Sequence, residues 1–327
     1  NEKLLMAHQG LTKAFPRSYV DFTSSTTDGK IVTVEVRNPQ DPLQFFILNT
    51  ESMELALLKN PTEHLAGRTV VPEAFTIKSK DHVPLSGFIT RTRGKAIGGV
   101  LMVHGGPHGP YDRYAHNADA QFLASIGFNV VQVNFRGSGG FGRRFERMGY
   151  GEWGRQMQED LYDATLWAFE NGIFTEGKTC IYGASYGAYA ALTAAAFEPK
   201  LYQCAAGHVG VYDLQELYRS GDIPETRSGR FYLRQVLGED QKVLFDNSPS
   251  NFADKIVVPV LLSAGLDDER APPKQTQIMS EALKSFNKEY EVYFTEKEGH
   301  GFYDSQLEAE RLERLGNFLL KSVISRE

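Results

Sequence analysis

Residues 180–189 read CIYGASYGAY, and this stretch decides the fold. Apolar residues lead into Gly-x-Ser-x-Gly and an alanine-rich run follows, which predicts a buried strand, a sharp turn and a helix. The turn holds the Ser185 hydroxyl out at the end of a sheet. Glycines stand at 183 and 187 because the strand and the helix pass too close there for side chains. The backbone N–H of Tyr186, at the helix start, faces any negative charge that forms beside Ser185.

A serine hydroxyl is a weak nucleophile near neutral pH, so Ser185 needs a base and a group that orients the base. In α/β-hydrolases these two follow the serine in the order acid, then histidine. An apolar run of strand length at 257–265 ends just before Asp268, and a predicted strand at 290–294 is followed by His300 between two glycines. One strand–helix–strand unit fits between the acid and the histidine, which places both loops at the same edge of the sheet.

Each of these features also has an ordinary structural interpretation. Residues 267–269 are all acidic and read equally well as a solvated turn, and His300 reads as a loop residue. In the required order, and each after a strand, they favour a triad in which His300 carries the proton and Asp268 orients the imidazole. Adjacent residues leaving a strand point in opposite directions, so only one of Asp267 and Asp268 can reach His300.

A glycine-rich loop after another predicted strand, 97–103, is placed to supply a second N–H to an oxyanion hole. The same region contains His104, His108, Asp112 and His116, which recur every four residues. That spacing lines up metal ligands only on a helix, and the glycines and prolines between them forbid a helix. We therefore predict no metal site.

Residues 137–142 read GSGGFG and match the Gly-x-Gly-x-x-Gly pattern of dinucleotide sites after a predicted strand. Such a site needs a helix that opens at once and an acid that ends the next strand. Here three further glycines follow, and the next acids, Glu159 and Asp160, lie within an amphipathic helical pattern. We predict a loop that shapes the backbone near the active site, and no cofactor.

Taken together, these motifs resemble the catalytic domain of the prolyl oligopeptidase family of serine peptidases. The resemblance covers residues 73–327 and is greatest to the acylaminoacyl-peptidase and dipeptidyl-peptidase-like branches. It rests on five segments: HGGP at 104–107, NFRGSGGFG at 134–142, GASYG at 183–187, Asp268 with Arg270, and GHG at 299–301.

The resemblance implies a triad of Ser185, Asp268 and His300, and it selects Asp268 over Asp267. It also implies that the N–H groups of Gly106 and Tyr186 form the oxyanion hole. His104 stands where some branches carry a tyrosine that assists the oxyanion, which favours the acylaminoacyl-peptidase arrangement.

Two further residues are candidates for the substrate pocket. Arg270 falls where the acylaminoacyl branch has an arginine that lines the specificity pocket, although a surface arginine is an equal alternative. Tyr212 follows a segment that reaches the sheet edge, so it is expected either in the pocket or in the core. Tyr186 and Tyr189 are open to the same two readings, and with these tyrosines in the pocket and Arg270 on its wall we expect a preference for apolar or aromatic acyl side chains.

The composition fits a globular enzyme. The chain has 327 residues, of which 41% are hydrophobic, and a net charge of −6, which argues against nucleic acid or an anionic membrane as partner. No apolar run approaches the ~20 residues of a transmembrane helix. Cys180 and Cys204 lie in apolar runs and are expected as two free buried thiols, which leaves the compartment open. We expect a cytoplasmic location.

The first 72 residues differ from the rest. Four strand patterns, at 19–24, 31–37, 43–49 and 54–59, are separated by turn sequences, and residues 60–72 read as a linker. Four antiparallel strands make one blade of a propeller, and one blade cannot close a propeller. Because the resembled family carries a propeller ahead of the hydrolase domain, the chain is expected to be the C-terminal part of a longer protein. A native small β-subdomain is the alternative.

The sequence thus predicts an α/β-hydrolase fold, a mostly parallel sheet flanked by helices, at 73–327, and an antiparallel β-appendage at 1–72. The expected function is a serine peptidase that cleaves short peptides through an acyl-enzyme. A carboxylesterase with the same triad and a catalytically silent interaction module are the alternatives. Unpaired edges of a lone blade invite pairing with another chain, so a homo-oligomer is expected.

Overall fold

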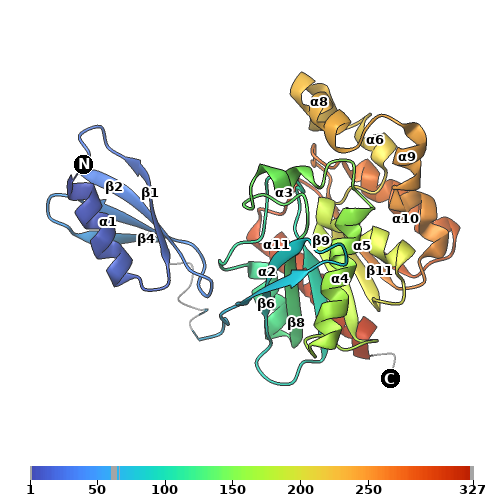
Figure 1. Ribbon diagram of the computed structural model, residues 1–327, viewed down its shortest axis with the longest axis horizontal. Helices are drawn as coiled ribbons and strands as arrows, with labels where there is room; N and C mark the ends of the chain where they lie inside the picture. The colour runs from blue at the N-terminus through green and yellow to red at the C-terminus, as the bar shows by residue number, and fades with distance from the viewer. Residues whose placement is uncertain (1, 60–64, 66, 325–327) are drawn as a thin grey trace.

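The computed structural model describes residues 2–59, 65 and 67–324, which fold into two units joined by one connecting segment (Figure 1). The N-terminal unit consists of α1 (Glu2–Ala14), β1 (Tyr19–Ser25), β2 (Ile31–Arg37), β3 (Gln44–Asn49) and β4 (Leu55–Lys59). The second unit begins with β5 (Glu73–Lys78), β6 (Pro84–Thr90), β7 (Gly98–Val103), α2 (Ala118–Ser125), β8 (Phe128–Asn134), α3 (Arg143–Arg147) and α4 (Gln156–Glu170). It continues with β9 (Thr179–Ala184), α5 (Tyr186–Phe197), β10 (Cys204–His208), α6 (Leu214–Leu217), α7 (Asp222–Glu225), α8 (Arg227–Val236) and α9 (Gln241–Asp246). A 3₁₀ helix (Pro249–Lys255), β11 (Val260–Gly265), α10 (Pro273–Ser285), β12 (Tyr290–Thr295) and α11 (Ser305–Ile324) complete it.

The N-terminal unit is an antiparallel sheet in the order β1-β2-β3-β4, with each strand beside its neighbour in sequence. Buried and half-buried residues alternate along β2, so one face of the sheet is covered. The helix α1 covers that face, and Ala7 and Leu11 pack against Val32 and Val34. The four predicted strands are therefore present. The sequence analysis missed α1, in which Leu4, Ala7 and Leu11 recur at helical spacing and pack on the sheet.

The second unit is built on an eight-stranded sheet in the order β12-β11-β10-β9-β7-β8-β6-β5. The strands from β12 to β8 are mutually parallel, and β6 and β5 are antiparallel additions at one edge. Every residue of β7, β8, β10 and β11 is buried, as expected for parallel strands covered on both faces. This unit has the predicted α/β-hydrolase fold.

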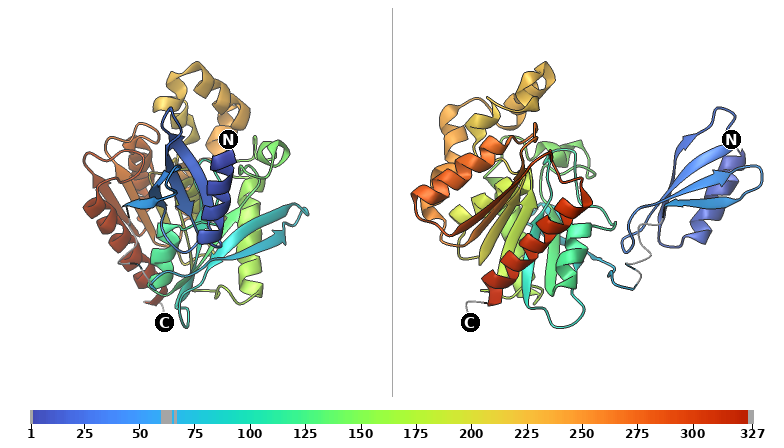
Figure 2. Two further views of the ribbon diagram at one scale, coloured as in Figure 1. Left: turned by 90° about the vertical axis from the view of Figure 1, so that its left-hand side faces the viewer. Right: turned by 180° about the vertical axis from the view of Figure 1, so that it is seen from behind.

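Helices cover both faces of this sheet. The view from behind shows α11 lying across one face, while α4 and α5 lie on the other (Figures 1 and 2). One apolar cluster joins the sheet to α4 and α5 through Met157, Leu161 and Leu192, and a second joins it to α11 through Leu315 and Phe318. Helices therefore shield both faces of the sheet from water, and the sheet is accessible to solvent mainly at the ends of its strands.

The prediction of two free thiols is wrong. Cys180 and Cys204 form a disulfide, because they are direct partners on the adjacent parallel strands β9 and β10. Both side chains are fully buried between the sheet and α11. The sequence placed each cysteine in an apolar run, but it did not show that the two runs would be neighbours in the same register.

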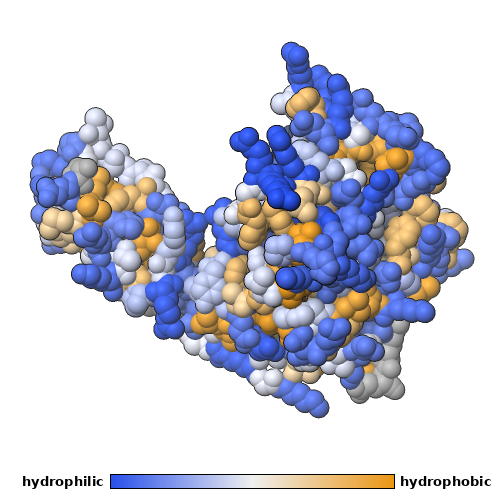
Figure 3. Space-filling model, in the orientation of Figure 1, coloured by the Kyte–Doolittle hydropathy of each residue, from blue (hydrophilic) through white to orange (hydrophobic). Residues whose placement is uncertain are grey.

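The predicted linker, 60–72, includes residues 60–64 and 66, which lie outside the described part of the chain. The two units also meet directly where the backbone N–H of His116 donates to the Asn38 carbonyl oxygen (3.0 Å). The His116 ring lies 2.9 Å from the carbonyl oxygen of Gln40. The surface in Figure 3 is mostly hydrophilic, with apolar residues in scattered patches. Among the described residues, none of the helices is both long and apolar enough to cross a membrane.

Candidate active site

Ser185 lies between the end of β9 and the start of α5, at the predicted sharp turn. Its backbone is left-handed, with φ of 57° and ψ of −119°, a strained conformation for a residue that has a side chain. The turn is tight, because a Cβ on Gly183 would lie 2.5 Å from the carbonyl carbon of Gly187, and a Cβ on Gly187 would lie 2.0 Å from the Val103 carbonyl oxygen of β7. The Ser185 N–H donates to the His208 carbonyl oxygen (2.9 Å), which ties the turn to the next strand. This geometry is that of a nucleophile elbow.

Asp268 follows β11 and is buried, whereas its neighbour Asp267 is exposed. The Asp268 carboxylate accepts hydrogen bonds from the backbone N–H groups of Arg270 and Ala271, both at 2.9 Å. It also lies 2.8 Å and 3.1 Å, through its two oxygens, from Nδ1 of His300. Asp268, and not Asp267, therefore reaches the histidine.

His300 is held on a short loop after β12. Glu298, also buried, accepts hydrogen bonds from the N–H groups of Tyr303 (2.7 Å) and Asp304 (3.0 Å), which closes the loop around His300. Because a carboxylate only accepts hydrogen bonds, Nδ1 must carry the proton that faces Asp268. In the neutral ring Nε2 then has its lone pair free, as a general base requires. The sequence analysis missed Glu298, an acid just before the Gly-His-Gly segment.

The loop after β7 passes directly over the elbow. A Cβ on Gly105 would lie 3.3 Å from the Cβ of Ser185. Gly106 follows and, with Tyr186 and Ser185, lines the same cleft. Among the described residues, no partner accepts a hydrogen bond from the N–H of Gly106 or of Tyr186. Both donors are free to bind an oxygen placed beside Ser185.

A cleft of about 1000 Å³ opens at the carboxyl ends of the parallel strands. It brings Ser185 and His300 together with the loop that contains Gly106. Its wall also carries a group of aromatic and aliphatic side chains, namely Trp153, Val209, Val211, Leu217, Ile223, Tyr232 and Leu233. A cleft of this size and lining suits an elongated, partly apolar ligand.

The structure separates the two predicted pocket residues. Arg270 lines the cleft, about half exposed, so it is at once a surface residue and a wall residue. The prediction that Tyr212 lies in the pocket is wrong. Its side chain is fully buried, and its hydroxyl is packed against Gly207 and Gly210, where a Cβ on either glycine would lie 2.3 Å from that oxygen. The aromatic rings of Tyr186 and Tyr189 are buried as well.

The four residues that recur every four positions and were considered as metal ligands each contact a different partner. Nε2 of His104 lies 2.8 Å from the Ser138 hydroxyl, and the His104 ring stacks on Phe135. Nε2 of His108 accepts from the Trp153 indole N–H at 3.4 Å, whereas His116 contacts the N-terminal unit. Asp112 accepts from the Gln132 amide (2.6 Å).

The loop of the dinucleotide-like pattern is fixed by a buried ion pair. Arg136 donates to both carboxylate oxygens of Asp160 (2.6–2.9 Å) and to Asp81, the latter at 2.7 and 2.8 Å. Arg136 and Asp160 are almost fully buried. This arrangement anchors the backbone after β8 to α4 and to the β5–β6 turn, which agrees with a loop that shapes the site.

Sequence analysis also missed His208, the last residue of β10. Its ring lines the cleft, lies 2.9 Å through Nδ1 from the Ser263 hydroxyl, and meets the Phe302 ring edge-on at 4.8 Å. Burial lowers the pKa of His208 well below its usual value, and the nearby positive charge of Arg311 acts in the same direction. The available signal was a histidine at the carboxyl end of an apolar run.

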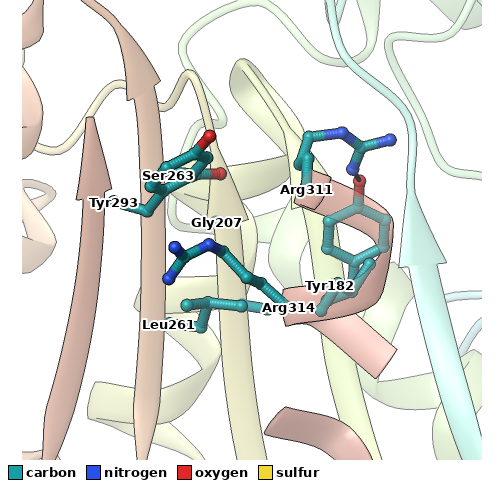
Figure 4. A pocket seen from close by; sticks show the side chains of 9 residues that line it. Tyr182, Gly207, Leu261, Ser263, Tyr293, Arg311 and Arg314 are labelled. Carbon is teal, nitrogen blue, oxygen red and sulfur yellow. Dashed lines mark hydrogen bonds between the residues drawn. The ribbon is translucent and has the colours of Figure 1, made fainter. Parts of the chain in front are cut away.

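A second, small pocket lies between α11 and the sheet and is lined in part by Ser263, the partner of His208 (Figure 4). Its volume of about 10 Å³ leaves room for no more than about one water molecule. Beside it, Arg311 donates to the Tyr182 hydroxyl (2.7 Å) and to Asp119 (3.0 Å), so α11 is bound to the sheet by a buried polar network. This pocket belongs to the support of the site and not to the substrate cleft.

Comparison with known proteins identifies the family of the chain. The family model of the prolyl oligopeptidase family matches residues 114–325. The chain belongs to the prolyl oligopeptidase family. It is 33% identical over 300 residues to dipeptidyl aminopeptidase BIII of Pseudoxanthomonas mexicana, a match that covers 86% of this chain and 43% of that protein. It is 27% identical over 216 residues to the acylamino-acid-releasing enzyme of Sus scrofa, covering 64% and 29%.

Solved structures share the fold at lower sequence identity. A puromycin-hydrolyzing peptidase of Mycobacterium tuberculosis superposes with a TM-score of 0.82 at 24% identity, covering 90% of this chain and 46% of that one. The acylaminoacyl peptidase of Pyrococcus horikoshii gives a TM-score of 0.82 at 21% identity, covering 95% and 51%. The chain spans less than half the length of the two relatives compared above by sequence.

Proposed function

We propose that this chain is the hydrolytic part of a serine peptidase that cleaves short peptides. The observation that carries the proposal is the hydrogen bond between the buried Asp268 and His300 (2.8 Å), because His300 lines the same cleft as Ser185 on its strained turn. The three residues follow three separate strands in the chain order Ser, Asp, His that is typical of α/β-hydrolases, and Ser185 and His300 line one cleft. Membership in a peptidase family supports the same reaction class.

In the proposed reaction Ser185 Oγ attacks the peptide carbonyl carbon while Nε2 of His300 takes the hydroxyl proton. The negative oxygen of the tetrahedral intermediate binds the N–H groups of Gly106 and Tyr186. His300 then gives its proton to the amine, which leaves, and an acyl-enzyme remains on Ser185. Water repeats the sequence, with His300 again as base, and releases the acid. Asp268 keeps the Nδ1 proton in place and stabilises the charged imidazole.

The proposed substrates are short peptides cleaved near the amino end. The names of relatives include both a dipeptidyl aminopeptidase and acylamino-acid-releasing enzymes, so both free and acylated amino ends are to be tested. The apolar and aromatic side chains on the cleft wall favour apolar or aromatic acyl residues.

Two measurements test the proposal. A fluorophosphonate probe should label the wild-type chain and not Ser185→Ala, because only an activated serine reacts. Absence of labelling would indicate a catalytically silent module. An amide and an ester with the same acyl residue should then be compared, and turnover of the ester alone would indicate a carboxylesterase.

A cytoplasmic location is a separate proposal. Disulfides persist mainly in oxidising compartments, so the bond between Cys180 and Cys204 favours the opposite answer. Cell fractionation, with the free thiols blocked before lysis, decides between them.

A further inference from the structure

One wall of the cleft is built by the segment 217–233, which includes α7 and most of α8. In Figure 1 α8 projects from the edge of the catalytic unit, beyond α6. Leu217, Ile223, Tyr232 and Leu233 from this segment face the cleft. The position of this wall therefore sets the shape of the space that a substrate side chain enters.

Asp222 docks this wall on the loop that holds the catalytic acid. Its backbone N–H donates to the Glu269 carbonyl oxygen at 2.8 Å. Its carboxylate accepts from Nε of Arg270 (2.7 Å) and from Nη2 (2.8 Å), which is a two-point ion pair. Arg270 stands two residues after Asp268, which binds the Arg270 N–H at 2.9 Å.

The charges that line the cleft indicate that the Arg270–Asp222 ion pair also affects which ligands can bind there. Among the described lining residues, Arg270 is the one lysine or arginine, and Asp222 and Glu225 are the carboxylates. The Arg270 and Asp222 side chains are 53% and 37% exposed, so a solute in the cleft can reach them. An unpaired guanidinium there would attract a carboxylate, because planar two-point binding of carboxylates is what arginine does best.

We propose that Asp222 is a specificity-determining residue of the cleft, which occupies Arg270 and thereby excludes substrates with acidic acyl side chains. The inference rests on the proposed function and adds to it the class of side chain that is rejected. Repulsion between Asp222 and an acidic substrate acts in the same direction as the occupied guanidinium, as in other interfaces that select against a competitor.

The test is Asp222→Asn, which keeps the shape and the backbone hydrogen bond to Glu269 but removes the charge. The readout is the ratio of kcat/KM for a peptide with an acyl Glu residue to that for the same peptide with Gln. We expect this ratio to rise about tenfold at low salt and to rise less at 0.5 M salt, where charges are screened. The double variant Asp222→Asn/Arg270→Gln should lose the gain.

Glu225→Gln is the matched control, because it removes the same charge from the same cleft without touching Arg270. Its ratio should rise at most about twofold. An equal rise in both variants would show a general effect of cleft charge, and an unchanged ratio in Asp222→Asn would show that Arg270 is not masked. Either result overturns the inference.

Binding separates this inference from the proposed peptidase activity. The same Glu and Gln peptides are titrated calorimetrically into Ser185→Ala and into Ser185→Ala/Asp222→Asn. The ratio of their Kd values should shift in favour of Glu by about tenfold even if the wild type turns over neither peptide. No shift in Kd overturns the inference, whatever the turnover.

Discussion

The strands of the two units differ in how many of their faces are buried. In β2 buried residues alternate with half-buried ones, and the sheet has one covered face. In β8 every residue is buried, because helices cover both faces. The difference decides where chemistry is placed. Among the described residues that line the cleft, all come from the catalytic unit, where the loops after parallel strands converge. Changes in that unit should therefore dominate activity.

The largest expected effect is that of Ser185→Ala. Loss of the nucleophile in a triad lowers kcat by roughly 10⁶-fold, and the fold should persist because the hydroxyl has no hydrogen-bond partner among the described residues. Peptide turnover and thermal unfolding measure the two sides of this prediction. A variant that keeps even a tenth of the wild-type rate would refute the assignment of the nucleophile.

The next effect separates two adjacent acids. Asp268→Asn should lower the rate of acylation by roughly 10⁴-fold, because an asparagine amide stabilises the wrong tautomer of His300. Asp267→Asn is the matched control, since Asp267 is exposed and should change the rate less than about threefold. Single-turnover kinetics give both rates. Similar losses in the two variants would contradict the geometry of the site.

The acid sensitivity of folding should also reside in the catalytic unit. Burial lowers the pKa of His108 to about 4, from 6.5 in the unfolded chain. Between these values the unfolded state binds a proton that the folded state does not, so the free energy of unfolding falls as the pH falls from 6.5 to 4. Protonation also conflicts with the hydrogen bond that Nε2 accepts from Trp153, since an indole N–H only donates.

Denaturant unfolding at several pH values measures this effect. His108→Gln should lose less stability between pH 6.5 and pH 4 than the wild type, by about 1–3 kcal/mol. The control is His82→Asn, because His82 is exposed, and asparagine tolerates its φ of 67°. Parallel pH profiles in all three proteins would show that His108 is not the responsible group.

The parts of the molecule that could be predicted are those with local signals. The elbow at Ser185 was visible because glycine spacing, a strand and a helix coincide within ten residues. Asp268 and His300 were visible because each follows a strand in a fixed order. The Cys180–Cys204 bond, by contrast, depends on the register of two strands, which the sequence does not specify. Whether Tyr212 faces the cleft or the core depends on the turn after β10, and no local pattern sets that direction.

The smallest expected effect on catalysis comes from the N-terminal unit, which we propose mediates self-association. Among the described strands β1 and β4 are the edges of its sheet, and β4 exposes Leu58 (58%). An exposed apolar edge pairs with other strands, and a lysine placed there blocks the pairing. Leu58→Lys should therefore shift the sedimentation profile toward monomer and leave fluorophosphonate labelling within about twofold of wild type.

Leu5→Lys, on α1, is the matched control, because Leu5 is equally exposed (59%) but cannot pair as a strand. Removal of residues 1–72 should have the same two results as Leu58→Lys. If Leu5→Lys dissociates the chain as well, association is through the helix, and if the wild type is a monomer the edges have no role in assembly.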